Sequence, residues 1–312
     1  MLATIDRLLH SGRYMTPTIS IAFRAPAQDL LPFISTYYEF TVAGHDSVED
    51  YLHPEWGNIR MALDQPWIIG LDAGGQPIHS GVPSILQGPT SKPTYIKGSG
   101  TSFGIGILPS GWSRLWDIDA SSLADRIVPL ASVLDDPESS AFIRDIYAAA
   151  GIDARKDIAD RFLSQRVGRS KPLPSSPKVA MLLSLLADPE NASVEQLTDR
   201  LGMTQSQLAR LCKRTLGFTP KLLLRRQRFL RMLGTMHARP YGEWRDFIDP
   251  QYTDQSHLVR DFQFFLGMSP RAYFSLPRPI LNAAARARTA MFGQPLQGLH
   301  NAVDKTSISS KT

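Results

Sequence analysis

Two stretches in the last third of the chain place cationic and hydrogen-bonding side chains on one face of an expected helix. In the first stretch Ser206, Arg210 and Lys213 lie opposite a row of leucines. The second stretch, opposite a row of Phe and Leu, carries the polar residues Gln255, Ser256, His257 and Arg260. An arginine can donate two hydrogen bonds to O6 and N7 of guanine, and a glutamine can pair with adenine. These side chains are therefore candidates for contact with base edges, the alternatives being contact with phosphate or a solvated surface.

The first of these helices is expected to follow a tight turn. Ser193 and Gln196 have the spacing of a capping box, so a helix should begin there. Gly202 can end that helix in the left-handed conformation, which glycine adopts without steric cost. Thr204 and Gln207 form a second capping box directly afterwards. The pattern predicts a helix-turn-helix unit over residues 193–220.

A second unit of the same kind is predicted over residues 241–274. Trp244 opens the apolar stripe of a short helix, Pro250 ends it, and Thr253 or Asp254 caps the next helix. Both second helices end in the same way, with the sequence LGFTP at 216–220 and LGMSP at 266–270. In each case a glycine ends the helix, and a hydroxyl residue followed by proline begins another. This agreement indicates an internal repeat.

A helix over residues 219–233 is expected to join the two units. If it runs for about 15–18 residues it spans roughly 22–27 Å. That length suits two recognition helices held about one DNA turn apart, near 34 Å. Arg225, Arg226 and Arg228 on this helix fit either a solvated face or contacts with phosphate.

The charge of the chain is distributed unevenly. Residues 1–170 carry 14 Lys and Arg against 19 Asp and Glu, whereas residues 171–290 carry 18 against 9. The second half is therefore the candidate for binding a polyanion. The sequence has no apolar run of 18 residues and no recognisable leader at its N-terminus, so we expect a cytoplasmic protein without a membrane partner. The single cysteine, Cys212, excludes an intramolecular disulfide.

Composition divides the chain into regions. Residues 166–178 are rich in Pro, Ser and cations and are expected to be a linker. The region before it, residues 1–165, contains short β-rich segments and then, over residues 120–165, apolar residues at helical spacing. The first of these apolar residues are Leu123, Ile127, Leu130 and Leu134. The expected strands are PTISIAF, YYEFTV, NIRMAL, WIIGL, TYIKG and SFGIGIL. Residues 179–276 have helical periodicity, and residues 277–312 are expected to be a tail that is partly disordered or forms a surface helix.

Residues 193–274 resemble the DNA-binding domain of the AraC/XylS family of transcription regulators. The most specific match is TDQSHLVRDFQFFLGMSPRAY, residues 253–273. The resemblance implies base-edge contacts in the first unit from Ser206, Ala209 and Arg210. In the second unit it implies contacts from Gln255, Ser256, His257 and Arg260. Two positions depart from the family pattern, since Gln251 stands where the family has Gly and Cys212 where it has Phe.

The N-terminal half resembles, more faintly, a domain of unknown function that occupies the position of the sensor domain in a subset of the same family. The matching pieces lie within residues 26–134 and imply a cupin-like β fold followed by helices. The expected fold class is therefore α+β, with a β-rich sandwich or barrel, closing helices and an all-α domain of two helix-turn-helix units. The implied partners are double-stranded promoter DNA, RNA polymerase and an unidentified small-molecule effector, with a homodimer left open and no cofactor.

The residues leave two other kinds of function as alternatives. A metal-dependent cupin-type enzyme with an accessory helical domain would need a close His-x-His pair and a carboxylate, which the spacing of His45, His53 and His79 does not provide. No phosphate loop or nucleophile elbow is present either, so the chain is not expected to be an enzyme. The second alternative is a module that binds acidic proteins.

Four tryptophans fit an effector pocket or, preferably, the core: Trp56, Trp67, Trp112 and Trp116.

Overall fold

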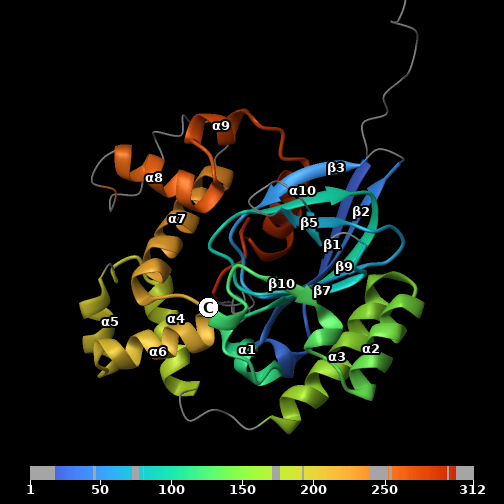
Figure 1. The fold of residues 1–312 in the computed structure, drawn as a ribbon, viewed down its shortest axis with the longest axis horizontal. Helices are drawn as coiled ribbons and strands as arrows, with labels where there is room; N and C mark the ends of the chain where they lie inside the picture. Colours follow the sequence, from blue (N-terminus) through green and yellow to red (C-terminus); the bar gives the residue numbers. More distant parts are fainter. Residues whose placement is uncertain are drawn as a thin grey trace, which may run out of the picture.

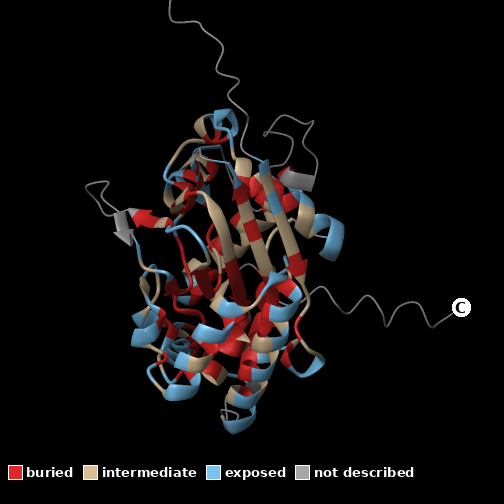
Figure 2. Cartoon of the chain, turned by 90° about the vertical axis from the view of Figure 1, so that its right-hand side faces the viewer, coloured by how far each residue is buried: buried red, intermediate tan, exposed pale blue. Residues whose placement is uncertain are grey.

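A β-rich N-terminal half and a helical C-terminal half make up the computed structural model of the chain (Figure 1). The structure describes residues 18–44, 47–71, 77–79, 81–170, 176–191, 193–238, 252, 255–293 and 295–299. The expected α+β class is confirmed. Figure 2 shows that buried positions lie along the strands and on the inward faces of the helices.

Two antiparallel sheets form the N-terminal half. The larger sheet has the order β1 (Thr18–Arg24), β2 (Ile34–Ala43), β9 (Gly100–Ile107), β4 (Asn58–Ala62), β7 (Ser84–Gln87) and β10 (Ile127–Pro129). The smaller sheet has the order β3 (Val48–Leu52), β8 (Thr94–Gly98), β5 (Ile68–Leu71) and β6 (Pro77–His79). The six segments expected as strands are all found in these sheets, as β1, β2, β4, β5, β8 and β9.

The larger sheet separates two apolar layers. On one face it packs against three helices, α1 (Pro109–Leu115), α2 (Pro137–Ala148) and α3 (Gly151–Arg169). On the other face Phe40 and Val42 of β2 meet Ile96 of the smaller sheet and Trp67, which directly precedes β5. Side chains of β2 therefore reach both layers, because successive residues of a strand point to opposite faces.

Residues 120–134 do not form the helix expected from the spacing of their apolar residues. They form one 3₁₀ turn at Ala120–Ser122, the short strand β10, and a second 3₁₀ turn at Leu130–Ser132. Asp125 has a φ of 57°, and a residue in that left-handed region interrupts a right-handed helix. The second helical part of this region is confirmed as α2, whose N-terminus is capped by Asp136.

The C-terminal half consists of helices at both ends of a long connecting helix, α7 (Pro220–Ala238) (Figure 1). One end carries α4 (Ser176–Ala187), α5 (Val194–Leu201) and α6 (Gln205–Leu216). The other end carries α8 (Gln255–Leu266) and α9 (Pro270–Ser275). Each end has its own apolar core. Because α3 continues to Arg169 and α4 begins at Ser176, the segment between them is shorter than the linker expected over 166–178.

The predicted turn chemistry of the first unit is present. Ser193 with Gln196 and Thr204 with Gln207 both form reciprocal capping boxes. Gly202 between them has a φ of 57°, the left-handed conformation that favours glycine. The first helix-turn-helix thus spans α5 and α6 as predicted. In the second unit, residues 239–251 and 253–254 lie outside the described residues, so the short helix expected around Trp244 and the effect of Gln251 are not addressed by the structure.

The end of the chain returns to the N-terminal half. The segment expected to be a loose tail or surface helix contains α10 (Pro279–Phe292), which packs on β1 and β3. Its buried side includes Ile280 and Leu281 together with small alanines, which allow the helix to approach the sheets closely. Asp50 of β3 accepts hydrogen bonds from the backbone N–H groups of Ile280 (2.9 Å) and Leu281 (3.0 Å). Residues 300–312 lie outside the described part.

No helix in the described ranges is both long enough and apolar enough to cross a membrane.

Replacing Asp50 with Ala should weaken the attachment of α10. The carboxylate accepts from two N–H groups at the first turn of the helix, and loss of an N-terminal cap of this kind costs about 1 kcal/mol. Hydrogen exchange of the amides at 280–285 should therefore be faster in Asp50→Ala. Glu49→Ala is the matched control, because that neighbouring side chain is 64% exposed. Equal exchange rates in the two variants would show that the cap does not hold α10.

Candidate nucleic-acid interface

The helix α6 presents its N-terminal half to solvent. Ser206 and Arg210 are exposed, Ala209 is half-buried, and Lys213 is exposed one turn further on. The side chains of Arg210 and Lys213 make no hydrogen bond or ion pair with any other described residue. The opposite face is buried and includes Cys212, whose thiol pKa burial raises to about 12. The predicted polar face of α6 is thus available to a ligand, and Cys212 is a core residue as expected.

The C-terminal end of α6 rests on the N-terminal half. It contacts the 3₁₀ turn at Ala120–Ser122 and α1. Gly217, with a φ of 88°, lies so close to this surface that a Cβ atom there would be 2.8 Å from Pro89. The Nε atom of Arg214 lies 3.6 Å from a carboxylate oxygen of Asp119. The helix α6 is therefore anchored at one end and open to solvent at the other.

The helix α8 presents a second polar face. Gln255, Ser256 and Arg260 are exposed, as the helical spacing predicts. His257 is half-buried and turns toward the helices behind it. Its Nε2 atom lies 3.1 Å from Nη2 of Arg228, and its ring packs edge-on against Tyr252 with centroids 5.2 Å apart. The structure thus brings three of the four predicted residues to the surface and places His257 against the scaffold.

A buried carboxylate joins α8 to α7. Asp261 is completely inaccessible to solvent and accepts hydrogen bonds from Nε of Arg225 (2.5 Å) and the hydroxyl of Tyr252 (2.8 Å). Its other charged neighbour is Arg228, at 3.6 Å. Burial, and then the neighbouring Asp261, raises the pKa of Tyr252. The sequence did carry a signal for this residue, because Asp261 falls within the apolar stripe of α8 between Leu258 and Phe265.

The third arginine of α7 has a different partner. Arg226 is completely buried and lies over the ring of Trp56 from the N-terminal half, 4.0 Å from the ring centroid. Its Nε atom donates to the backbone carbonyl of Thr90 at 3.1 Å. Burial lowers the pKa of the Arg226 guanidinium to about 9. The expectation of a solvated or phosphate-binding arginine face on α7 is therefore wrong for Arg225, Arg226 and Arg228, because their partners come from elements distant in sequence.

Seven exposed cationic side chains of α4 to α9 have no hydrogen bond or ion pair to another described residue. These are Lys178, Arg200, Arg210, Lys213, Lys221, Arg260 and Arg271. Two of them lie on α6, one each on α4, α5 and α8, and the other two at the N-terminal turns of α7 and α9. Because unpaired surface cations attract phosphate, this arrangement favours a polyanionic partner.

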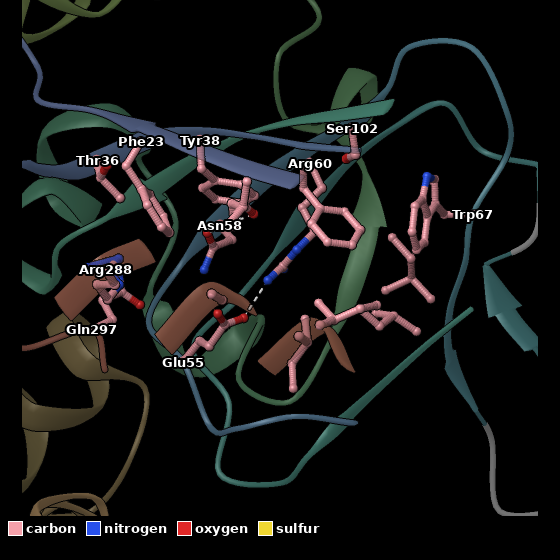
Figure 3. Close-up of a pocket in the computed structure, with 18 residues that line it drawn as sticks. Phe23, Thr36, Tyr38, Glu55, Asn58, Arg60, Trp67, Ser102, Arg288 and Gln297 are labelled. Carbon is pink, nitrogen blue, oxygen red and sulfur yellow. Dashed lines mark hydrogen bonds and ion pairs between the residues drawn. The ribbon is translucent and has the colours of Figure 1, made fainter. Parts of the chain in front are cut away.

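The N-terminal half contains a cavity between the two sheets and α10 (Figure 3). Its volume is about 120 Å³. The walls are mainly apolar and include Phe23, Phe40, Trp67, Ile96 and Ile280. Eight polar side chains also line it: Thr36, Tyr38, Glu55, Asn58, Arg60, Ser102, Arg288 and Gln297. Such a mixture of apolar walls with a few convergent polar groups is typical of small-molecule sites.

A buried ion pair lies within this cavity. Arg60 is 8% exposed and pairs with Glu55, and it also donates to the amide oxygen of Gln87. The hydroxyl of Tyr38 donates to Oδ1 of Asn58 at 3.4 Å. Burial lowers the pKa of Arg288 to about 10, although Glu55 opposes that shift. The cavity therefore contains two guanidinium groups that are largely withdrawn from water.

The four tryptophans have three different roles. Trp112 and Trp116 pack in the core beneath the helices, as preferred from the sequence. Trp67 lines the cavity, and Trp56 contacts the helical half. Periodicity gave no means of separating these roles.

The histidines considered as metal ligands do not converge among the described residues. His53 is buried, and its Nε2 atom is 2.7 Å from the hydroxyl of Tyr273 on α9. His45 lies outside the described residues, and the side chain of His79 is not described. Within the described ranges, no three His, Cys, Asp or Glu side chains are grouped so that they could hold a metal ion.

Comparison with known proteins gives few matches. No protein-family profile and no curated protein matches the chain. A structure of ToxT from Vibrio cholerae shares 10% identity and a TM-score of 0.42, over 83% of this chain and 97% of that chain. A ToxT structure described as bound to an unsaturated fatty acid shares 9% identity and a TM-score of 0.40, over 83% and 95%. The AraC-like transcriptional activator CuxR shares 11% identity and a TM-score of 0.28, over 68% and 86%. At these values the likenesses carry no argument about the function of this chain.

Replacing Asp261 with Ala should destabilise the second unit. The substitution leaves Arg225 and Arg228 without their carboxylate, and removal of one partner from a buried pair costs about 3 kcal/mol or more. Denaturant unfolding should therefore show a lower midpoint. Asp199→Ala on α5 is the control, because Asp199 is exposed. If both variants unfold at the wild-type midpoint, the buried carboxylate does not stabilise this half.

Proposed function

We propose that the chain is a sequence-specific transcription regulator that binds DNA through α6 and α8. The observation that carries the proposal is the outward position of unpaired polar and cationic side chains on both helices. In each case the helix is fixed from behind by an apolar core, so the polar face is presented rigidly. Rigid presentation favours recognition, since a side chain that is already positioned loses less entropy on binding.

The residue types suit a division between bases and phosphates. Arg210 and Arg260 can donate to guanine in the major groove, and Gln255 can pair with adenine. Ser206 and Ser256 are small enough for the helices to approach the base edges closely. We assign three other cations to phosphate contacts because of where they lie. Lys213 is on α6, and Lys221 and Arg271 are on the first turns of α7 and α9. His257 is assigned to support α8 through its contact with Arg228.

The length of α7 suits a pair of adjacent half-sites. Its 19 residues correspond to about 28 Å, and the two units lie at its opposite ends (Figure 1). Successive major grooves on one side of a duplex are about 34 Å apart. The difference is within reach of side chains, so one chain can contact both grooves.

We assign the control of this activity to the N-terminal cavity. A regulator that responds to a small molecule needs a binding site in contact with its DNA-binding part. The cavity lies between α10 and both sheets, and its wall residue Glu55 precedes Trp56, which contacts α7. The cavity therefore supports a response to a small-molecule effector.

Selection from a random duplex library tests the DNA-binding proposal. The full chain should enrich a motif of two parts whose centres are separated by about 10 base pairs, because each recognition helix enters its own groove. Binding should weaken steeply as salt rises, since each phosphate contact releases counterions. Enrichment of no sequence at moderate salt would contradict the proposal.

Truncation of either outward arginine should weaken binding to the selected duplex. Arg210→Ala and Arg260→Ala are each expected to cost about 1–3 kcal/mol and to relax the choice of base at one position. Electrophoretic mobility shifts with duplexes altered one base pair at a time measure both effects. Arg161→Ala is the matched control, because Arg161 is an exposed arginine on α3 in the other half. If all three variants lose the same amount of binding free energy, the arginines act only through the net charge of the chain.

A further inference from the structure

A short segment that follows β3 and ends at the first residue of β4, His53–Asn58, lies between the cavity and the helical half. On the cavity side Glu55 pairs with Arg60. On the other side the ring of Trp56 supports the guanidinium of Arg226 on α7. His53 at the beginning of the segment meets Tyr273 on α9. One stretch of six residues thus contacts the ligand cavity and the helices that follow both recognition helices.

The backbone of Glu55 is connected to Arg226 by Thr90. The N–H group of Glu55 donates to Oγ1 of Thr90 at 2.8 Å, and the N–H group of Thr90 donates to the carbonyl of Glu55 at 2.9 Å. The carbonyl of Thr90 then accepts from Nε of Arg226 at 3.1 Å. Thr90 therefore bonds to both residues. A movement of the Glu55 backbone displaces Thr90, and with it the carbonyl group that accepts from Arg226.

The docked position of Arg226 is only partly compensated, although its Nη1 atom donates to Oε1 of Gln227 at 3.2 Å. Its Nη2 atom is buried without a hydrogen-bond partner in the described part of the chain. No carboxylate in that part forms an ion pair with it, although Glu55 and Asp125 favour its charge through space. A buried guanidinium without a direct ion pair has lost hydration that opening the interface would restore. The contact is therefore one that a modest change can release.

The cavity has an excess of positive charge. Its lining contains two guanidinium groups, Arg60 and Arg288, but Glu55 is the one carboxylate among the described lining residues. Arg288 lies over the rings of Phe23 and Phe292 and has no ion pair within the described ranges. Figure 3 shows Arg288 and Gln297 at one end of the cavity and Trp67 at the other. An anion with a small apolar body would complement both the charge and the walls.

We propose that the cavity binds a compact organic anion and that the segment His53–Asn58 transmits its presence to α7 and α9. The anion competes with Glu55 for Arg60. Glu55 then leaves its position, and the bonds through Thr90 that hold Arg226 weaken. The inference rests on the proposed function in one respect, because it takes the helical half to be the part that acts on DNA.

Pulsed electron paramagnetic resonance with two spin labels tests the transmission without DNA. Labels at Ser140→Cys on α2 and Gln263→Cys on α8 occupy exposed positions in the two halves, while the native Cys212 is fully buried. Glu55→Gln keeps the size of the side chain but removes its charge. We expect a broader and longer distance distribution in that variant. Glu49→Gln, on the exposed side of β3, should give the wild-type distribution. An unchanged distribution in Glu55→Gln would overturn the transmission.

Paired probes test the chemistry of the ligand. Phenylacetate and hexanoate are compared with phenylacetamide and hexanamide, which have the same shape without the charge. At least one acid should raise the Tm of the wild-type chain and shift the label distances toward those of Glu55→Gln. Arg288→Met, checked for folding by circular dichroism, should weaken that binding by at least about tenfold. If the amides act as well as the acids, or if neither acid binds, the assignment of an anion is wrong.

The readouts separate this inference from the proposed function. Label distances and Tm shifts involve no nucleic acid, so failure of the duplex selection would leave them unaffected. Conversely, a chain that selects a two-part motif but shows no change in Glu55→Gln would retain the DNA-binding proposal and lose the transmission.

Discussion

The arrangement of the helical half depends on the burial of one carboxylate. Asp261 lies where no water reaches it, and a lone charge in that position would cost several kcal/mol. Arg225 and Arg228 of α7 supply the compensating charge, so α8 is stable in the orientation that lets both approach. Because α7 also continues directly from the first unit, it sets the position of α6 relative to α8. The outward polar faces therefore owe their geometry to an inward ion pair.

Local signals in the sequence predicted the first helix-turn-helix unit well. A capping box such as that of Thr204 and Gln207 involves residues three positions apart, and the conformation of Gly202 depends on its missing side chain. Helical periodicity separates the buried Leu208 from the exposed Arg210 for the same reason. Six of the strands were also readable from short β-rich runs between turn residues. These features require no knowledge of what lies on the other side of the element.

The features that the sequence did not reveal are those made by distant partners. Arg226 has the same appearance in the sequence as a solvated arginine, and its burial follows from Trp56, which lies in the other half. The helix α10 resembles a polar tail because half of its buried residues are alanines, and its first turn is held by hydrogen bonds to Asp50, more than two hundred residues earlier. At 120–134, apolar spacing suggested a helix, but Asp125 in the left-handed region and Pro129 break the chain into short turns.

The return of the chain to the N-terminal half links the two halves mechanically. The helix α9 ends at Ser275 and α10 begins at Pro279, and a connection of three residues spans at most about 10 Å. Arg278 in this connection lies over the ring of Tyr273, 4.2 Å from its centroid. This contact limits how far the connection can extend, and so leaves little slack between the two helices. The helix that follows α8 is thus tied to α10, which lines the cavity. A displacement of α9 larger than this slack must move Ile280 and Arg288, so the state of the cavity and the position of the second unit are mutually constrained.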